Sequence, residues 1–254
     1  MRNDNDMKAA RKGLHALVAL AVVLGIAILA LIVGLVVNAQ GQLTSVAAQD
    51  DSELLDDSQS SEPKLTNATT QVINLVSLMG LSQSDAVAKI GHGAWVQDKG
   101  SLSTLGFSHE VVVVLSDEKG DSLSGTPTVT LGLDSSGQVA AASYEASTAL
   151  LGYGELSFID AVSKFHIVEH VVSAVGLNGI DEGSVVLPDR KDYSFYGSDR
   201  VTLDEERYTF KGTELAAGQS YSWNATLDYD YTEANEASDL SKTVKKITVS
   251  IMKG

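Results

Sequence analysis

Residues 14–37 form an unbroken apolar run, and this run constrains the architecture of the chain more than any other feature. It contains no Asp, Glu, Lys or Arg, and His15 is its only ionisable residue. As a helix, its 24 residues would extend about 36 Å, and the hydrocarbon core of a bilayer is about 30 Å thick. The sequence therefore predicts a single transmembrane helix at residues 14–37.

The charges that flank this run predict its orientation. Residues 1–13 contain four Lys and Arg, whereas no Lys or Arg follows the run before Lys64. Lys and Arg beside a membrane-spanning helix tend to remain in the cytoplasm. We therefore expect a cytoplasmic tail at residues 1–13 and a plasma-membrane protein whose C-terminal domain lies outside.

A cleaved signal peptide is the alternative interpretation, because Val37-Asn38-Ala39 resembles a small-residue cleavage site. The hydrophobic regions of signal peptides span about 7–15 residues, so the longer run found here favours an uncleaved signal anchor. The chain contains no cysteine, which excludes disulfide bonds and a lipid-modified cysteine as the anchor. The exported part must therefore be stable through its hydrophobic core alone.

The chain is strongly acidic, with a formal net charge of −15. Residues 65–254 carry 25 Asp and Glu against 13 Lys and Arg, which disfavours nucleic acid and anionic lipid headgroups as partners. Residues 38–64 are rich in Gln, Ser and Asp and contain almost no aromatic or β-branched residues. Such a segment cannot bury enough apolar surface to fold, so we expect a disordered acidic linker at residues 38–64.

Two segments repeat the same helix-initiation pattern at a spacing of 75 residues. Residues 81–90 and 156–165 share six of ten amino acids, including a Ser N-cap that is followed three residues later by Asp as its capping-box partner. The two pairs are Ser82 with Asp85 and Ser157 with Asp160. Two unrelated amphipathic helices could converge on these caps, but the same order of helices and strands follows each, which favours duplication.

Alternating segments after each helix predict strands. Residues 126–133 and 138–144 read as a hairpin across the turn at residues 134–137, and residues 221–231 alternate between apolar and polar side chains. The strands are consecutive and are joined by turns too short for crossover helices, so the sheet should be antiparallel.

The predicted fold class is therefore α+β: a single N-terminal transmembrane helix, then two tandem α-β-β-β units with an antiparallel sheet. We expect the first α+β repeat at residues 65–146 and the second at residues 147–254. Each unit is expected to pack its helices on one face of the sheet.

The first repeat contains the motif Gly80-Leu81-Ser82-x-x-Asp85-Ala86-Val87-x-x-Ile90-Gly91. With the Asp-x-x-Gly turn of the following hairpin, this motif resembles the repeat of β-lactamase inhibitory proteins and of the small outer-membrane assembly lipoproteins. The resemblance implies helix–helix–sheet modules, sometimes in tandem, that bind other proteins and have no catalytic activity. The longer second unit and the absence of disulfides depart from that pattern. No binding residue carries over, because those of the family lie on variable sheet and loop positions.

One short motif has the spacing of a zinc site. His166-Ile167-Val168-Glu169-His170 matches the H-x-x-E-H arrangement of inverted zinc peptidases, in which two His hold zinc and Glu is the general base. However, the apolar stripe of this segment leaves both His on its flank, and no downstream Glu stands out as a third ligand. We expect a solvated helix flank here and assign no catalytic, cofactor-binding or metal site. A zinc-dependent peptidase that uses His166, Glu169 and His170 remains the least favoured alternative.

Together these features predict a single-pass, membrane-anchored extracytoplasmic protein whose domain binds another protein of the cell envelope, without catalysis and without a cofactor. Its expected partners are the lipid bilayer, through residues 14–37, and an envelope protein bound on the open face of the sheet. A ligand-sensing or transport-accessory domain is the main alternative, and a hydrophobic cavity would favour it. The cytoplasmic tail is too short to hold an effector domain, which disfavours direct signalling.

Overall fold

The computed structural model describes residues 64–91, 94–98, 104–107, 109–115 and 126–254. The chain divides into two compact units, Met1–Gln59 and Ser60–Gly254, and all described residues belong to the second. The boundary expected between residues 146 and 147 falls inside this second unit, near the end of a strand.

Three parts of the predicted organisation lie outside the described residues: the cytoplasmic tail at 1–13, the transmembrane helix at 14–37 and all of the linker at 38–64 except Lys64. In the described part of the chain, no helix is both long enough and apolar enough to cross a membrane.

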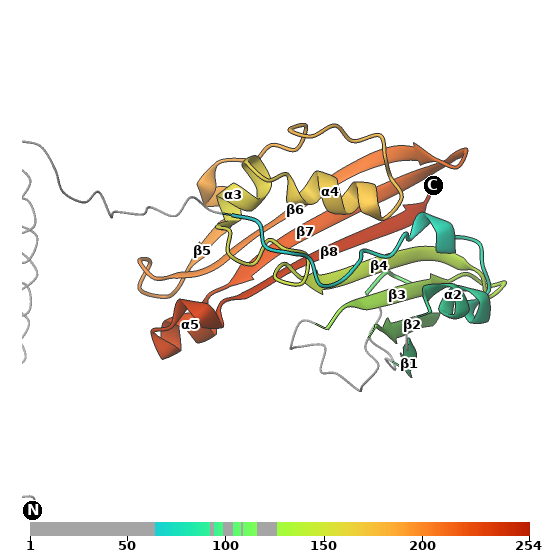
Figure 1. Ribbon diagram of the computed structural model, residues 1–254, viewed down its shortest axis with the longest axis horizontal. Coiled ribbons are helices and arrows are strands. Elements are labelled where there is room, and N and C mark those ends of the chain that lie inside the picture. Colours follow the sequence, from blue (N-terminus) through green and yellow to red (C-terminus); the bar gives the residue numbers. More distant parts are fainter. Residues whose placement is uncertain (1–63, 92–93, 99–103, 108, 116–125) are drawn as a thin grey trace, which may run out of the picture. The chain divides into compact units, whose positions relative to one another are not determined.

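A single antiparallel sheet of eight strands forms the framework of this unit, in the order β1-β2-β3-β4-β8-β7-β6-β5 (Figure 1). The strands are β1 (Trp95–Asp98), β2 (His109–Val114), β3 (Thr128–Leu133), β4 (Val139–Ser147), β5 (Ser194–Tyr196), β6 (Leu203–Ala216), β7 (Gln219–Asp230) and β8 (Val244–Lys253). From one edge of the sheet the strands run β1 to β4 in chain order, and from the other edge they run β5 to β8 in chain order. The two halves meet where β4 pairs with β8.

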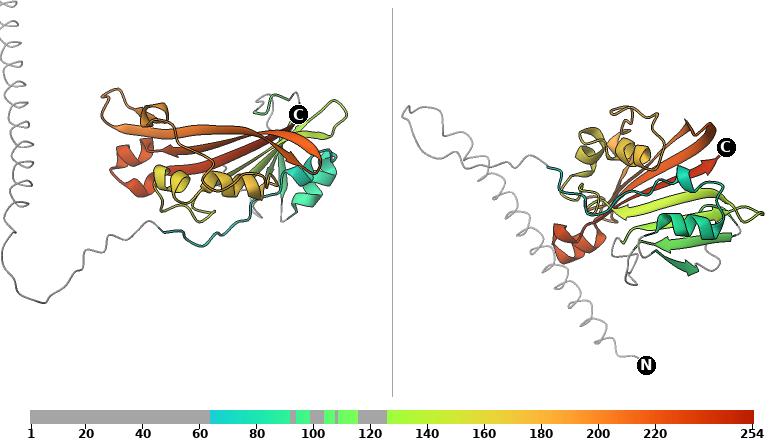
Figure 2. Two further views of the ribbon diagram at one scale, coloured as in Figure 1. Left: turned by 90° about the horizontal axis from the view of Figure 1, so that it is seen from above. Right: turned by 45° about the vertical axis from the view of Figure 1, so that its right-hand side comes forward.

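The helices are η1 (Val76–Leu78), α2 (Gln83–Ile90), α3 (Phe158–Ser163), α4 (Ile167–Ala174), η3 (Arg190–Asp192), α5 (Thr232–Ala237) and η4 (Leu240–Lys242). Figure 2 shows that α2, α3 and α4 cover the same face of the sheet. Alternate side chains of β7 point toward these helices and are buried from Tyr221 to Tyr229, whereas the side chains between them are exposed or half-buried. The predicted alternation of this strand is therefore confirmed.

One hydrophobic core lies between the sheet and the helices and includes residues from both halves. Tyr144 of β4, Phe158 of α3 and Tyr229 of β7 are among its largest fully buried side chains. The ring of Phe158 stacks on Tyr193 at 5.2 Å and meets Tyr229 edge-on at 5.4 Å. Because the core is continuous, the two halves of the sheet share their packing.

The predicted helix caps and hairpin turn are confirmed. Ser82 Oγ accepts a hydrogen bond from Asp85 N at 3.2 Å and donates to Asp85 Oδ2 at 2.7 Å. Ser157 and Asp160 repeat this pair, at 3.1 and 2.7 Å. In the turn between β3 and β4, Asp134 Oδ1 accepts from the backbone N–H groups two and four residues later.

The predicted fold class is wrong in how it groups the strands. Two tandem units of three strands each were expected, but the structure has one continuous eight-stranded sheet to which each half contributes four strands. The strands absent from the prediction are the two edge strands, β1 with four residues and β5 with three. They are too short to show an alternating pattern. The junction of β4 with β8 joins segments about 100 residues apart, which no local pattern indicates.

Candidate functional site

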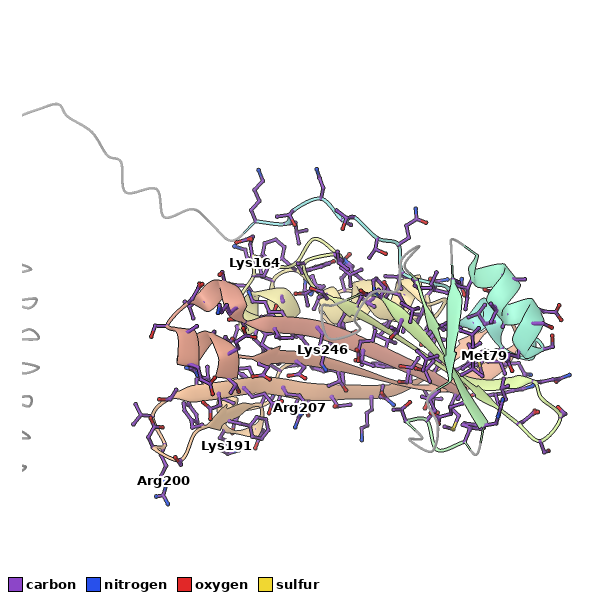
Figure 3. All side chains as sticks on the ribbon, turned by 90° about the horizontal axis from the view of Figure 1, so that it is seen from below. Met79, Lys164, Lys191, Arg200, Arg207 and Lys246 are labelled. Carbon is purple, nitrogen blue, oxygen red and sulfur yellow. The ribbon has the colours of Figure 1, made fainter. Side chains whose placement is uncertain are left out.

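We call the face of the sheet opposite α2, α3 and α4 the open face, because no helix of the described residues covers it over β6, β7 and β8 (Figure 2). The strand registers place its side chains in rows. They are Ser143 and Glu145 of β4, Arg207, Thr209 and Lys211 of β6, Asn224, Thr226 and Asp228 of β7, and Lys246, Thr248 and Ser250 of β8. Figure 3 labels Arg207 and Lys246 on these strands.

Hydrogen bonds between neighbouring strands join many of the short polar side chains on this face. They link Thr209 Oγ1 with Thr226 Oγ1 at 2.8 Å, Thr248 Oγ1 with Glu145 Oε2 at 3.0 Å, and Ser250 Oγ with Ser143 Oγ at 2.9 Å. Each bond restricts the rotamers of two side chains. The open face is thus a preorganised surface of hydroxyl groups rather than a set of free side chains.

A row of charged residues crosses the open face. Asp228 pairs in register with Arg207 on one side and with Lys246 on the other, and its Oδ2 lies 3.8 Å from Lys246 Nζ. Asp228 Oδ1 is buried and has no hydrogen-bond partner among the described residues. Burial raises the pKa of Asp228 to about 6, although Lys246 opposes this, and repulsion from Glu205 adds to the rise. The carboxylate of Asp228 can therefore accept a hydrogen bond from a partner or pair with a positively charged side chain of that partner.

A loop before β2 covers the part of the open face that lies over β3. The carboxylate of Glu110 accepts hydrogen bonds from the backbone N–H groups of Thr104, Leu105 and Phe107, at 2.6, 2.7 and 3.2 Å. The ring of Phe107 lies over Gly132, where a Cβ atom would be 2.6 Å from Phe107 Cδ2. A hollow of about 190 Å³ remains between this loop and strands β7 and β8.

The expected solvated helix flank is confirmed for His170, which is exposed on α4, but not for the rest of the H-x-x-E-H motif. His166 is the N-cap of α4 in the left-handed conformation, at φ 50°. Glu169 is only 1% exposed, and its Oε1 accepts hydrogen bonds from Gly183 N and Val185 N, both at 3.1 Å. The prediction was wrong for Glu169 because the loop after α4 folds back over it. The carboxylate holds this loop in place.

The second histidine of the motif joins the same loop. His170 Nδ1 lies 2.7 Å from Tyr153 Oη, and its Nε2 lies 2.9 Å from Glu182 Oε1. The hydrogen bond with His170 lowers the pKa of Glu182, and burial raises the pKa of Tyr153. Among the residues that the structure describes, no three His, Asp or Glu form a group that could hold a metal ion.

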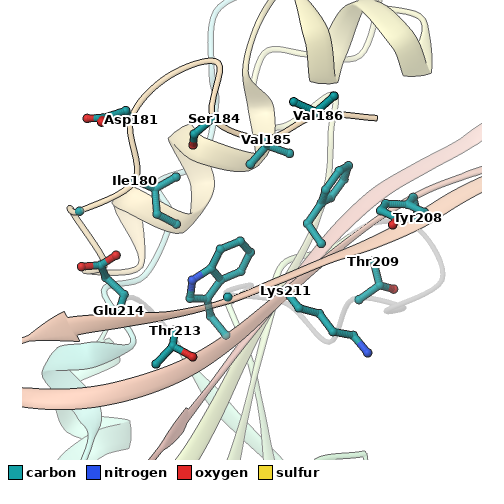
Figure 4. A pocket seen from close by; sticks show the side chains of 14 residues that line it. Ile180, Asp181, Ser184, Val185, Val186, Tyr208, Thr209, Lys211, Thr213 and Glu214 are labelled. Carbon is teal, nitrogen blue, oxygen red and sulfur yellow. The ribbon is translucent and has the colours of Figure 1, made fainter. Parts of the chain in front are cut away.

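A larger groove lies on the helix-covered side, between the loop at residues 179–186 and strands β6 and β7, with a volume of about 710 Å³ (Figure 4). Trp223 contributes to it, although the sequence indicates no more than a core position for this residue. The apolar side chains that face Trp223 come from a loop with no periodic pattern, so the groove could not be predicted from the sequence.

No protein-family model, no curated protein and no solved structure matches this chain. A functional assignment therefore depends on the chemistry of its own residues.

Proposed function

We propose that this chain is a single-pass, membrane-anchored protein of the cell envelope, and that its C-terminal domain binds another protein on the open face without catalysis. The observation that carries the proposal is the contrast between the two faces of the sheet. Helices bury one face, whereas the other exposes a preorganised array of hydroxyl and charged side chains over β6, β7 and β8.

The chemistry of the open face suits recognition of a protein. Its cross-strand hydrogen bonds already hold the short side chains in place, so a partner would lose little side-chain entropy on binding. Regularly spaced hydroxyl groups can donate and accept hydrogen bonds with a partner's polar rim. Asp228 Oδ1 would gain the hydrogen-bond donor that it lacks.

The charges of the open face suggest what the partner presents. Arg207 and Lys246 are 50% and 41% exposed, whereas Glu205 and Asp228 are 25% and 14% exposed. The cations therefore protrude from this face while the carboxylates lie lower, although the whole chain is acidic. We propose that the partner places carboxylates against Arg207, Lys211 and Lys246.

The proposed relation to the helix–helix–sheet modules of β-lactamase inhibitory proteins rests on two further observations. Ser82 and Ser157 form the same capping interaction in α2 and α3, 75 residues apart. The strand order is also the same from either edge of the sheet. Both observations support a duplicated module, and modules of that kind bind proteins.

The proposed location rests on the sequence. The apolar run at residues 14–37 would bind the lipid bilayer, with residues 1–13 in the cytoplasm. The acidic linker would then connect this anchor to the domain outside the plasma membrane.

Site-specific photocrosslinking in the native cell tests the proposal. A photoreactive phenylalanine analogue replaces Asn224, which is exposed on the open face, or Ile159, which is 45% exposed on α3. We expect one protein to be captured in stoichiometric amounts from position 224 and not from position 159. Charge reversal in Arg207→Glu and Lys246→Glu should reduce that capture at least fivefold.

Equal capture from both positions would count against the open face as a binding surface. So would recovery from position 224 of abundant envelope proteins alone, at the level of a control that contains only residues 1–63. Capture that is insensitive to Arg207→Glu and Lys246→Glu would exclude the proposed role of the cations.

A ligand-sensing or transport-accessory domain is the second candidate, and the groove of about 710 Å³ is the observation that favours it. Its volume lies within the range of about 300–1,000 Å³ that is typical of small-molecule sites. The zinc-dependent peptidase has no comparable support, because the described His, Asp and Glu residues form no metal-binding group.

A further inference from the structure

The groove between the loop at residues 179–186 and strands β6 and β7 lies mainly on the helix-covered side of the sheet, and it shares only Thr209 and Lys211 with the open-face residues named above. Trp223 and Phe210 belong to the side of the sheet that packs against the helices, and the loop that closes the groove continues from α4. A ligand held by Trp223 and the loop would therefore contact mostly other residues than a protein bound on the open face.

Aromatic and aliphatic side chains line the two walls of the groove. Trp223, Phe210 and Tyr208 form the wall on the sheet, and the rings of Tyr208 and Phe210 meet edge-on at 4.9 Å. Ile180 and Val185 face them from the loop (Figure 4). Trp223 is 9% exposed and Phe210 is 6% exposed, so a ligand that enters between these walls meets the uncovered part of the aromatic side chains on one side and aliphatic carbons on the other.

Two glycines keep the groove in this shape. A Cβ atom at Gly212 would lie 2.6 Å from Trp223 Cε2, so the absence of a side chain lets the indole lie directly on β6. A Cβ atom at Gly179 would collide with the carboxylate of Glu214. The glycines thus allow an indole ring and a carboxylate to occupy the same groove.

The charges along the groove are negative. Glu214 and Asp181 lie at the same end of it, one on β6 and the other on the loop (Figure 4). Lys211 is the only cation among the lining residues, and its side chain points away from the groove. The side chain of Asp181 also points away from the groove in Figure 4, so a cationic ligand meets the carboxylate of Glu214 and an aromatic side chain, and no facing positive charge.

We propose that this groove binds an arginine side chain of a peptide segment, with the guanidinium group stacked on Trp223 and hydrogen-bonded to Glu214. Arginine fits better than lysine because its planar guanidinium group can stack on a ring and also bind a carboxylate with two N–H donors. The groove is larger than one arginine side chain, so residues next to the arginine can contact Ile180 and Val185.

Nuclear magnetic resonance of the full-length protein in detergent micelles, labelled with ¹⁵N at tryptophan, tests this proposal. The chain has two tryptophans, so it gives two indole N–H signals, and Trp95→Phe assigns them. The probe is the peptide N-acetyl-Gly-Arg-Gly-amide. We expect it to shift the Trp223 signal in a saturable manner and to leave the Trp95 signal unchanged.

Three comparisons decide the outcome. The same peptide with citrulline in place of arginine should bind at least fivefold more weakly, because citrulline has the same shape without the charge. Glu214→Gln should weaken arginine binding at least fivefold, and Glu236→Gln, on the exposed surface of α5, should not change it. Equal shifts with both peptides, equal effects of both variants, or no shift of the Trp223 signal would each overturn the proposal. None of these results depends on the open face.

Discussion

At the scale of single residues, Asp228 has the least favourable surroundings on the open face. Its side chain is 14% exposed, one carboxylate oxygen is buried without a hydrogen-bond partner in the described structure, and Glu205 repels it. Lys246 at 3.8 Å compensates only in part. Such a group lowers the stability of the free protein and becomes favourable when a partner supplies a donor.

We predict that Asp228→Asn stabilises the protein at pH 8 and not at pH 3.5. The folded-state pKa of about 6 lies above the ordinary value of 3.8. Between these two pH values the folded protein therefore binds more protons than the unfolded protein. The stability associated with protonated Asp228 is complete below about pH 3.8 and is lost as the pH rises through about 6. We expect a gain of about 1–2 kcal/mol at pH 8 for Asp228→Asn.

Urea unfolding at the two pH values measures this difference. Asp230→Asn is the matched control, because Asp230 is exposed two residues away on the same strand. A gain for Asp228→Asn that is the same at pH 3.5 and pH 8 would show that ionisation of Asp228 is not its cause.

At the scale of elements, a buried carboxylate links α4 to the loop that follows it. Glu169 Oε1 accepts two backbone hydrogen bonds from this loop, and His170 binds Glu182 in the same loop. The same loop supplies Ile180 and Val185 to the groove. The interactions of Glu169 therefore position one wall of the groove.

We predict that Glu169→Ala lowers the free energy of unfolding by about 2 kcal/mol, because it leaves two partly buried N–H groups without their acceptor. Glu169→Gln should cost less, since the amide oxygen can still accept. Glu182→Gln should change stability by less than about 0.5 kcal/mol, because Glu182 is 67% exposed. Urea unfolding gives these values, and equal losses for Glu169→Ala and Glu182→Gln would contradict the role of Glu169.

At the scale of the whole domain, the pairing of β4 with β8 makes one sheet from two halves. Seven residue pairs join these strands, from Ala141 with Met252 to Ser147 with Lys246. Val249 lies at this junction, fully buried between Tyr144 of β4 and Ala225 of β7. A change at this position therefore affects both halves at once.

We predict that the domain unfolds in a single transition. In hydrogen exchange, the slowest amides of β3 and β7 should show the same free energy of opening, and Val249→Ala should lower both values by an equal amount, about 1–3 kcal/mol. Two transitions, or a loss confined to β7, would show that the halves are independent.

Local interactions are what the sequence could determine. The caps of α2 and α3, the Asp134 turn and the alternation of β7 all follow from residues within a few positions of each other, and the structure has each of them. The net charge and the apolar run at residues 14–37 can also be identified without knowledge of the fold, and the proposals on location and membrane binding rest on them.

The tertiary structure decided how these elements are grouped and where the candidate sites lie. The bond from Thr248 to Glu145 joins residues 103 positions apart, and the junction of β4 with β8 follows the same long-range pairing. Glu169 is buried because a distant part of the loop folds over α4, and Trp223 borders a groove because Gly212 leaves room for its ring. Such features depend on which surfaces meet after folding, and a sequence pattern of a few residues contains no information on that.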